Sequence, residues 1–395
     1  MKKGFFVLTA SIFIPQLLWG TVFHYDNSIG RQIRIKNIIR QDIFINGEFN
    51  KRVEAMNKAL LEAVQTSNIF TLYRGKFYYY EKDLDTDDSY KLISLSDSSF
   101  FQDSQGHMII TPDIMMPEAR NIPTFPTNDL KPGDSWTAPG EEIHEGVYTS
   151  NDIIISRFDV NYVYLGDKMI DGKNYSMFSI DYEIADYPEN DPNIASLTGF
   201  THLIYYWNSS NNCPGFYNDK FSLLYTFKTG ETLMFKSTSE GRGELTMEAS
   251  EKQKNQIASD MKKSIPKNNE MSVREVADGI ILSLGNILFD FDKSTLKSGF
   301  EKKIEKFAEI LKKYPSIDIT VSGFTDNIGD EDYNKVLSEK RAKTVAEFLI
   351  SLGISPSRLS YSGYGSENPV SDNVSEAGRA LNRRVEIKLI TKEEP

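Results

Sequence analysis

The sequence changes its periodicity near residue 250, and this change limits the folds available to the chain. Before it, short alternating apolar and polar runs are separated by turn dipeptides such as Asn46-Gly47 and Thr229-Gly230, a pattern typical of strands joined by hairpins. After it, apolar residues recur at helical spacing between short strand-like runs. The pattern predicts two domains: an N-terminal, mainly β domain that is a sandwich or an open barrel, and a C-terminal α+β domain. A length of 395 residues is also more than one typical core supports.

Two parts of the region 21–250 do not follow the alternation. Residues 53–64 have apolar spacing that suits a helix, although their neighbours suit strands. Residues 111–142 are rich in proline and glycine but include Phe125 and Trp136. Because such side chains need apolar surroundings, we expect an ordered loop or a surface wrap in the second case.

Composition excludes several functions. With 45 basic and 56 acidic residues the formal charge is −11, which argues against nucleic acid as a partner. The four histidines are scattered without ligand spacing, and the acidic stretch 83–89 lacks the glycine and the glutamate of a calcium loop. We therefore predict no metal, no cofactor, and a hairpin turn at 83–89.

The first 20 residues have the pattern of a signal peptide. Lys2 and Lys3 precede an apolar run that contains Pro15, and Gly20 is a small residue suited to cleavage. This predicts export to the periplasm or the outer membrane. The single cysteine, Cys213, allows no internal disulfide, so both cores must be stable without one.

Residues 251–278 are polar and lysine-rich, which predicts a partly helical linker. The domain at 279–395 then reads β-α-β-α-β-β. Its second helix is expected over about 330–352, with Gly353 just beyond its end.

One charged residue stands out in that second helix. Arg341 lies four residues after Leu337 and four before Val345, on a stripe that should be apolar. Asn334, Ser338 and Arg341 share a face, and a short loop brings Asp326 close to the helix start. An aspartate and an arginine beside one pocket complement the ammonium and carboxylate of an amino acid. The alternative is that Asp326 and Arg341 only pair with each other.

Five blocks that occur in one order carry a resemblance to a known family. The domain resembles the OmpA-like peptidoglycan-binding domain of outer membrane protein A and many envelope proteins. The blocks are ILFDFDKSTL at 287–296, GFTDNIG at 323–329, YNKVLSEKRAKTV at 333–345, GYGSENPV at 363–370 and GRALNRRVEI at 378–387.

The resemblance implies a site that holds the free end of the diamino acid in a peptidoglycan stem peptide. Asp326 and Arg341 match the family's charged pair. By the same match Asn334, Thr325, Asp292 and Arg383 line or support the pocket. Many members have histidine where this chain has Phe324, for which we expect altered packing beneath the loop.

These observations together predict a non-enzymatic envelope protein that tethers the envelope to the cell wall. The segment at 119–142 also resembles the leading region of long OmpA-like envelope proteins, and outer-membrane or periplasmic proteins are the expected partners of the N-terminal domain. Two alternatives stay open: an outer-membrane β-barrel or porin with a periplasmic peptidoglycan-binding domain, and a wall-associated hydrolase. The sequence does not determine which diamino acid is preferred.

Overall fold

The computed structural model of the chain describes residues 21–390, apart from a few short segments. The predicted signal peptide at 1–20 lies outside the described residues, as does the predicted domain boundary at 250. The segments left out are 68, 112–113, 115, 146–152, 189–190, 246–250, 265–270, 277–278, 286–288, 290–291, 316 and 391–395.

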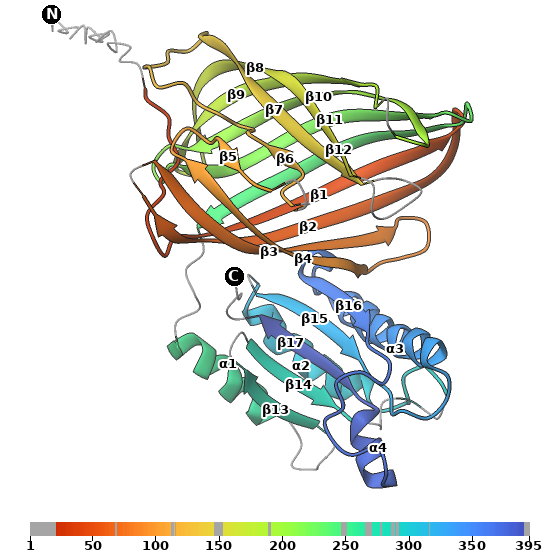
Figure 1. The fold of residues 1–395 in the computed structure, drawn as a ribbon. Coiled ribbons are helices and arrows are strands. Elements are labelled where there is room, and N and C mark those ends of the chain that lie inside the picture. Colours follow the sequence, from red (N-terminus) through yellow and green to blue (C-terminus); the bar gives the residue numbers. More distant parts are fainter. Residues whose placement is uncertain are drawn as a thin grey trace, which may run out of the picture.

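The N-terminal part is one large, strongly curved antiparallel sheet (Figure 1). Strand β1 pairs with both β2 and β12, so the order of the long strands is β4-β3-β2-β1-β12-β11-β10-β9-β8-β7. Two short strands extend the two ends: β5 pairs with β4, and β6 with β7. The strands are β1 Gln32–Ile45, β2 Glu48–Thr66, β3 Phe70–Asp83, β4 Tyr90–Asp103, β5 Met108–Ile109, β6 Ala119–Arg120, β7 Ser135–Glu145, β8 Ile153–Ile170, β9 Lys173–Asp186, β10 Ile194–Asn208, β11 Cys213–Phe227 and β12 Thr232–Leu245.

Turn chemistry explains the hairpins. Asn46 and Gly47, between β1 and β2, have φ values of 51° and 81°, and two successive positive φ angles match the twist of the flanking strands. Asp171 and Gly172 repeat this between β8 and β9, with 49° and 74°. The predicted turn at Asn46-Gly47 is confirmed, and the ambiguous segment 53–64 lies within strand β2.

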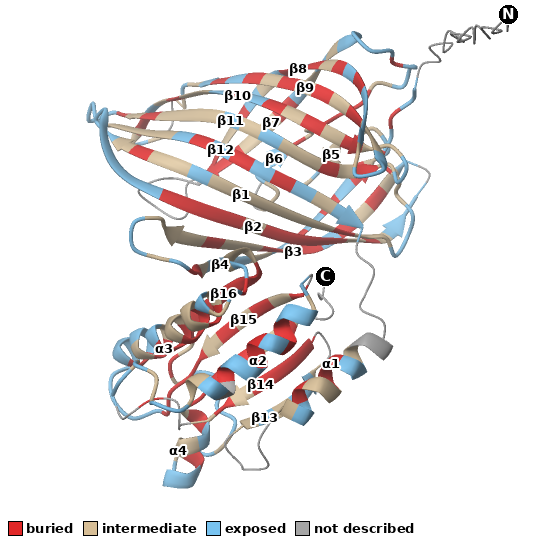
Figure 2. Ribbon diagram, turned by 180° about the vertical axis from the view of Figure 1, so that it is seen from behind, coloured by how far each residue is buried: buried red, intermediate tan, exposed pale blue. Residues whose placement is uncertain are grey.

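Burial alternates along the strands, as Figure 2 shows. On β9 the side chains of Phe178, Ile180, Tyr182 and Ile184 are buried. Glu183, which lies between the last two, is exposed. The inner face of this strand is thus mostly apolar, the pattern of a sheet with one face on a core. The outer face of the sheet is mixed, since Leu165 on β8 and Phe200 on β10 are exposed.

The proline-rich segment contributes to that core, and residues 121–134 form the predicted ordered loop with a buried aromatic side chain. Phe125 is 2% exposed, and its ring lies 4.9 Å from Trp207 and 5.4 Å from Phe178, measured between centroids. Phe23 packs against the same group, 5.0 Å from Phe178. Residues 135–142 belong to strand β7. Aromatic side chains draw the segment inward because burying them is more favourable than exposing them.

His144 provides a test of this interior. Burial lowers the pKa of His144 to about 4 from its ordinary 6.5, and the charge of Asp186 opposes the shift. Below pH 6.5 the unfolded chain binds a proton that the folded chain refuses until about pH 4, so stability falls as pH decreases through this window. We expect the free energy of unfolding of the wild type, relative to His144→Gln, to drop by about 3 kcal/mol between pH 7 and pH 4.

The measurement is urea unfolding followed by tryptophan fluorescence, because Trp136 and Trp207 both lie in the N-terminal part. His202→Gln is the control, since the His202 side chain is 50% exposed. This variant is expected to show the same change in the free energy of unfolding between pH 7 and pH 4 as the wild type. The prediction is contradicted if the free energies of unfolding of the wild type and of His144→Gln differ by the same amount at pH 7 and at pH 4.

The C-terminal part is an α+β unit whose sheet has the order β13-β14-β17-β15-β16. Strands β15 and β16 are parallel and the other pairs antiparallel. Helices α1, α2 and α3 contribute Met261, Leu311 and Val345 to its core. The elements are α1 Glu251–Ser264, β13 Met271–Val276, β14 Gly279–Leu284, α2 Glu301–Lys313, β15 Asp318–Gly323, α3 Glu331–Ser351, η1 Pro356–Arg358, β16 Leu359–Gly363, α4 Glu376–Asn382 and β17 Val385–Ile390.

From β14 onward this matches the predicted order, with the short helix α4 added between the last two strands. Helix α1 confirms the helical part of the prediction for 251–278, but the described residues of this segment pack on the C-terminal domain and do not form a free linker. Helix α1 buries Ile257, Ala258 and Met261 in the C-terminal core, and β13 pairs with β14. Three apolar residues on one face are enough to dock an otherwise polar helix. No helix among the described residues is both long and apolar enough to cross a bilayer.

The two parts touch along β4. Ser360 and Tyr361 of β16 pair in parallel with Tyr90 and Lys91 of β4. Lys58 of β2 is paired with Asp318 of β15 at 2.8 Å, and Lys343 of α3 contacts Asp87 in the β3–β4 turn. The predicted hairpin turn at 83–89 therefore lies against α3.

Candidate functional site

Helix α3 and the loop before it position the first group of site residues. The helix begins after Asp330, whose side chain accepts a hydrogen bond from the Tyr333 amide and so caps the first turn. Asn334, Ser338 and Arg341 follow at i, i+4 and i+7 and are 5%, 0% and 5% exposed. All three therefore face inward, toward the ends of β15 and β16, as their spacing predicted.

Arg341 is accommodated in the apolar stripe by an aromatic ring and a carbonyl group. Its guanidinium carbon lies 5.4 Å from the centre of the Phe289 ring, and its Nε donates to the Lys293 carbonyl at 2.9 Å. Burial lowers the pKa of the Arg341 guanidinium, Arg383 lowers it further, and the charges of Asp292 and Asp326 act in the opposite direction. Arg341 thus stands in a setting where a negative ligand would be stabilised.

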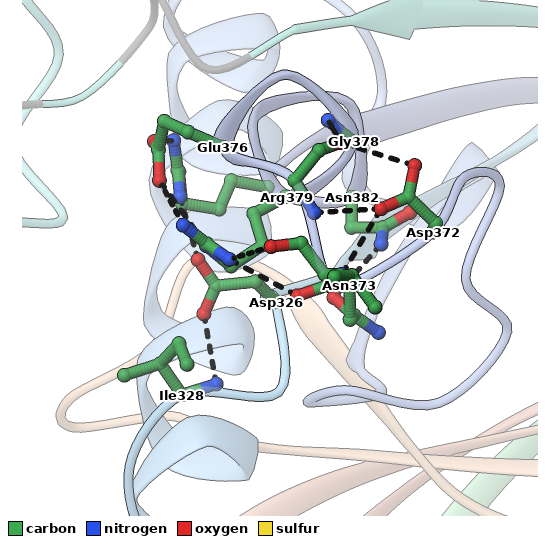
Figure 3. Close-up of polar contacts among 11 residues, drawn as sticks. Asp326, Ile328, Asp372, Asn373, Glu376, Gly378, Arg379 and Asn382 are labelled. Atoms are coloured by element: carbon green, nitrogen blue, oxygen red, sulfur yellow. Dashed lines mark hydrogen bonds and ion pairs between the residues drawn. The ribbon is translucent and has the colours of Figure 1, made fainter.

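Asp326 has a different partner from the one considered in the sequence. Its Oδ2 accepts from Nη1 of Arg383 at 2.6 Å, and its Oδ1 accepts from the Ile328 amide at 3.1 Å (Figure 3). Arg383 also donates to Glu376 at 2.6 Å. Among the residues that the structure describes, Asp326 therefore forms its ion pair with Arg383, at the end of α4, and not with Arg341.

The remaining predicted residues hold loops around this group. Asp292 has a left-handed backbone, with φ of 62°, and accepts a hydrogen bond from the Tyr333 hydroxyl. Asn334 donates through Nδ2 to the Ile328 carbonyl at 3.0 Å. The amide of Thr325 donates to the Gly365 carbonyl at 2.7 Å, while its buried Oγ1 has no hydrogen-bond partner in the part of the chain that the structure describes.

Three arginine side chains converge on a small cavity. Arg341, Arg383 and Arg384 line it together with Phe289, and its volume of about 10 Å³ is close to that of one water position. Arg384 is held by Glu386 at 2.9 Å and lies 3.9 Å from the Phe324 ring centre. The cavity can hold one small anionic group, such as one end of a carboxylate.

Phe324, at a position where the family pattern often has histidine, directly precedes Thr325 and Asp326 in the loop before α3. It is 5% exposed and stacks on Tyr364 with ring centres 5.3 Å apart. Together with Arg384 it forms a layer under the site and does not enter the cavity lining.

The sequence did not single out Tyr333, Glu376, Phe289 or the Lys293 carbonyl. Tyr333 and Phe289 stand inside the blocks that carried the resemblance, so a signal for them was present. Glu376 gave no local signal, because its contact with Arg383 depends on where α4 ends. No group of three or more potential metal-ligating side chains occurs among the residues described.

Comparison with known proteins places this geometry in a family. The profile of the OmpA family matches residues 288–383. Residues 288–383 are an OmpA family domain. This confirms the resemblance drawn from the five sequence blocks, and every proposed site residue lies inside the matched range.

Several relatives share the OmpA family domain. Outer membrane porin F of Pseudomonas fluorescens is 45% identical over 104 residues, which are 26% of this chain and 32% of the relative. The probable lipoprotein YiaD of Escherichia coli is 41% identical over 120 residues, 30% of this chain and 55% of the relative. The peptidoglycan-binding protein ArfA of Mycobacterium bovis is 40% identical over 103 residues, 26% of this chain and 32% of the relative.

The matched region therefore spans only between about a third and a little over half of these relatives. Among solved structures, the periplasmic domain of Helicobacter pylori MotB is 33% identical, with a TM-score of 0.30, and the match covers 32% of this chain and 83% of that one.

Proposed function

We propose that the OmpA family domain binds the free end of the diamino acid in peptidoglycan stem peptides. The observation that carries this proposal is the convergence of Arg341 and Arg383 on one small cavity with Asp326 and Asp292 beside them. A ligand carboxylate at the cavity would meet Arg341 and Arg383, and the ligand ammonium, outside the cavity, would meet the Asp326 carboxylate. The name of the M. bovis relative, a peptidoglycan-binding protein, supports the same ligand.

In this proposal the carboxylate of the ligand lies against the guanidinium of Arg341, which can offer two parallel N–H donors. The ammonium is taken by carboxylate oxygens of Asp326, with Asp292, Asn334 and Thr325 supporting the pocket. The Arg383 guanidinium either stays bound to Asp326 or turns toward the ligand carboxylate. In both arrangements its positive charge faces a carboxylate, because Glu376 also binds it.

At the level of the whole chain we propose an exported, non-enzymatic envelope protein of the periplasm or outer membrane that tethers the envelope to the wall. Each site is small, so its affinity is modest, and many sites on a polymeric wall supply avidity. The N-terminal part, proposed as a domain of residues 21–250, would contact outer-membrane or periplasmic proteins.

We propose an open barrel for this domain in preference to a sandwich, because a single hydrogen-bonded run of strands leads from β4 to β7. The porin alternative is not favoured. Lipid-facing strands need apolar side chains outside, whereas the charged residues Arg157, Glu183 and Glu240 interrupt the outer face. Inside, aromatic rings of β8 to β11 pack against one another. No observation on the described residues supports the hydrolase alternative.

A competition experiment tests the ligand. We expect the purified chain to sediment with isolated peptidoglycan, and diaminopimelic acid to release it because this molecule has both charges on each end. Pentane-1,5-diamine and glutaric acid, which keep one charge type each, should need at least about tenfold higher concentrations, since each loses one charge-assisted contact. Equal potency of the three competitors contradicts the zwitterion proposal.

A further inference from the structure

The interior of the N-terminal sheet contains two separate apolar clusters. One, on β2 to β4, includes Leu61, Phe77 and Phe100. The other includes Phe178 and Trp207 on β9 and β10. A domain normally has one contiguous core, so the separation shows that the inside of this sheet is not filled by its own side chains.

A cavity of about 280 Å³ lies between the two clusters. This is nearly twice the ~150 Å³ of an engineered apolar cavity that admits benzene, and just below the ~300 Å³ at which ordinary ligand pockets begin. Its lining includes Ile35, Leu61 and Phe77 from β1 to β3, and Leu203, Tyr205 and Pro214 from β10 and β11. The space suits a compact apolar molecule.

Two polar atoms on the wall lack a hydrogen bond. Asn37 on β1 and Asp219 on β11 both line the cavity, and the buried Oδ1 of each has no partner in the described part of the chain. Strand β12 separates them and places Gly241 opposite Asn37 and Ser239 opposite Asp219. Buried acceptors without donors are rare because each costs free energy, so a donor from a bound molecule would complete this end of the cavity.

The charges around the cavity restrict the head group of such a molecule. Glu118 and Asp219 both border it, and a carboxyl group, whether charged or neutral, supplies no positive charge to hold an anion. Lys58 also borders it, but its ammonium is paired with Asp318 at 2.8 Å. Burial raises the pKa of the Asp219 carboxyl, and the neighbouring Ser239 opposes the shift. A neutral carboxyl is a poor counter-charge for a cation.

We propose that this cavity binds a small uncharged amphiphile, whose apolar body lies between the two clusters and whose hydroxyl-type head donates its one hydrogen bond to Oδ1 of Asp219. The site is separate from the peptidoglycan site, and its existence does not depend on that function.

Three probes with the same chain and different heads test the proposal on the purified full chain: octan-1-ol, octanoate and octylammonium. We expect calorimetric titration to show binding of octan-1-ol with a negative heat-capacity change, the marker of apolar burial. Each of the ions should bind at least about tenfold more weakly. Failure of octan-1-ol to bind the wild type overturns the proposal, and tighter binding of octylammonium overturns the uncharged head group.

Two variants locate the site. Ala59 lines the cavity, so Ala59→Leu should fill part of it and weaken octan-1-ol binding at least about tenfold. Ala185→Leu, at an exposed position of β9, is the matched control and should bind like the wild type. Asp219→Leu should remove the preference for octan-1-ol over octane. Circular dichroism checks folding, and wild-type affinity in a folded Ala59→Leu variant overturns the location.

Discussion

Replacing Arg341 by alanine is expected to weaken sedimentation with peptidoglycan by between about tenfold and a hundredfold. The guanidinium supplies charge-assisted hydrogen bonds to the ligand carboxylate, and loss of one such contact costs about 1.5–3 kcal/mol. The fold should tolerate the change. Among other contacts, the variant loses the bond to the Lys293 carbonyl and the contact with Phe289. It also removes a cation that is 5% exposed and therefore costly to bury.

Binding is measured by co-sedimentation with isolated peptidoglycan over a range of wall concentrations, and folding by circular dichroism. Arg341→Lys should recover only part of the affinity, because an ammonium keeps the charge but loses the planar fork. Lys340→Ala, next to Arg341 in sequence and exposed on the same helix, should bind like the wild type. Unchanged binding of a folded Arg341→Ala variant would remove Arg341 from the site.

The sequence predicted the part of the site that depends on local periodicity. Asn334, Ser338 and Arg341 follow helical spacing, so their common buried face could be read from one segment. The partner of Asp326 could not, because Arg383 lies 57 residues further along the chain and reaches Asp326 only where helix α4 ends. Contacts of this kind are set by how helices and strands pack, which periodicity does not encode.

The same distinction applies to the fold. Turn dipeptides located the hairpins, because positive φ angles at Asn46 and Gly47 are a local requirement. The pairing of β1 with β12, which bends the strands into one curved sheet, joins segments about 200 residues apart and has no local signature. The polar, lysine-rich composition of 251–264 predicts a linker, whereas Ile257 and Met261, at i and i+4, form the face by which helix α1 docks on the C-terminal core.

Gly323→Ala is expected to destabilise the C-terminal part by more than about 3 kcal/mol, because overpacking against rigid backbone lies at the high end of such costs. A Cβ built on Gly323 would lie 2.0 Å from the Ser338 carbonyl oxygen and 2.8 Å from its carbonyl carbon. These are backbone atoms of α3, so no side chain can rotate to make room. The helix that holds Asn334 and Arg341 would have to move away from β15, and the site would lose its geometry together with its stability.

Gly299→Ala separates this clash from the ordinary cost of replacing a glycine. Gly299 has φ of +95° and nothing within 4 Å of a built Cβ, so alanine there should cost only about 1 kcal/mol of backbone strain. Chemical unfolding followed by circular dichroism at the helix band reports this part of the molecule, because the described helices α1 to α4 all lie after residue 250. Equal destabilisation by the two variants would show that α3 can shift freely against β15. In that case the close approach of the helix backbone to the end of the strand would not be what holds Arg341 in place.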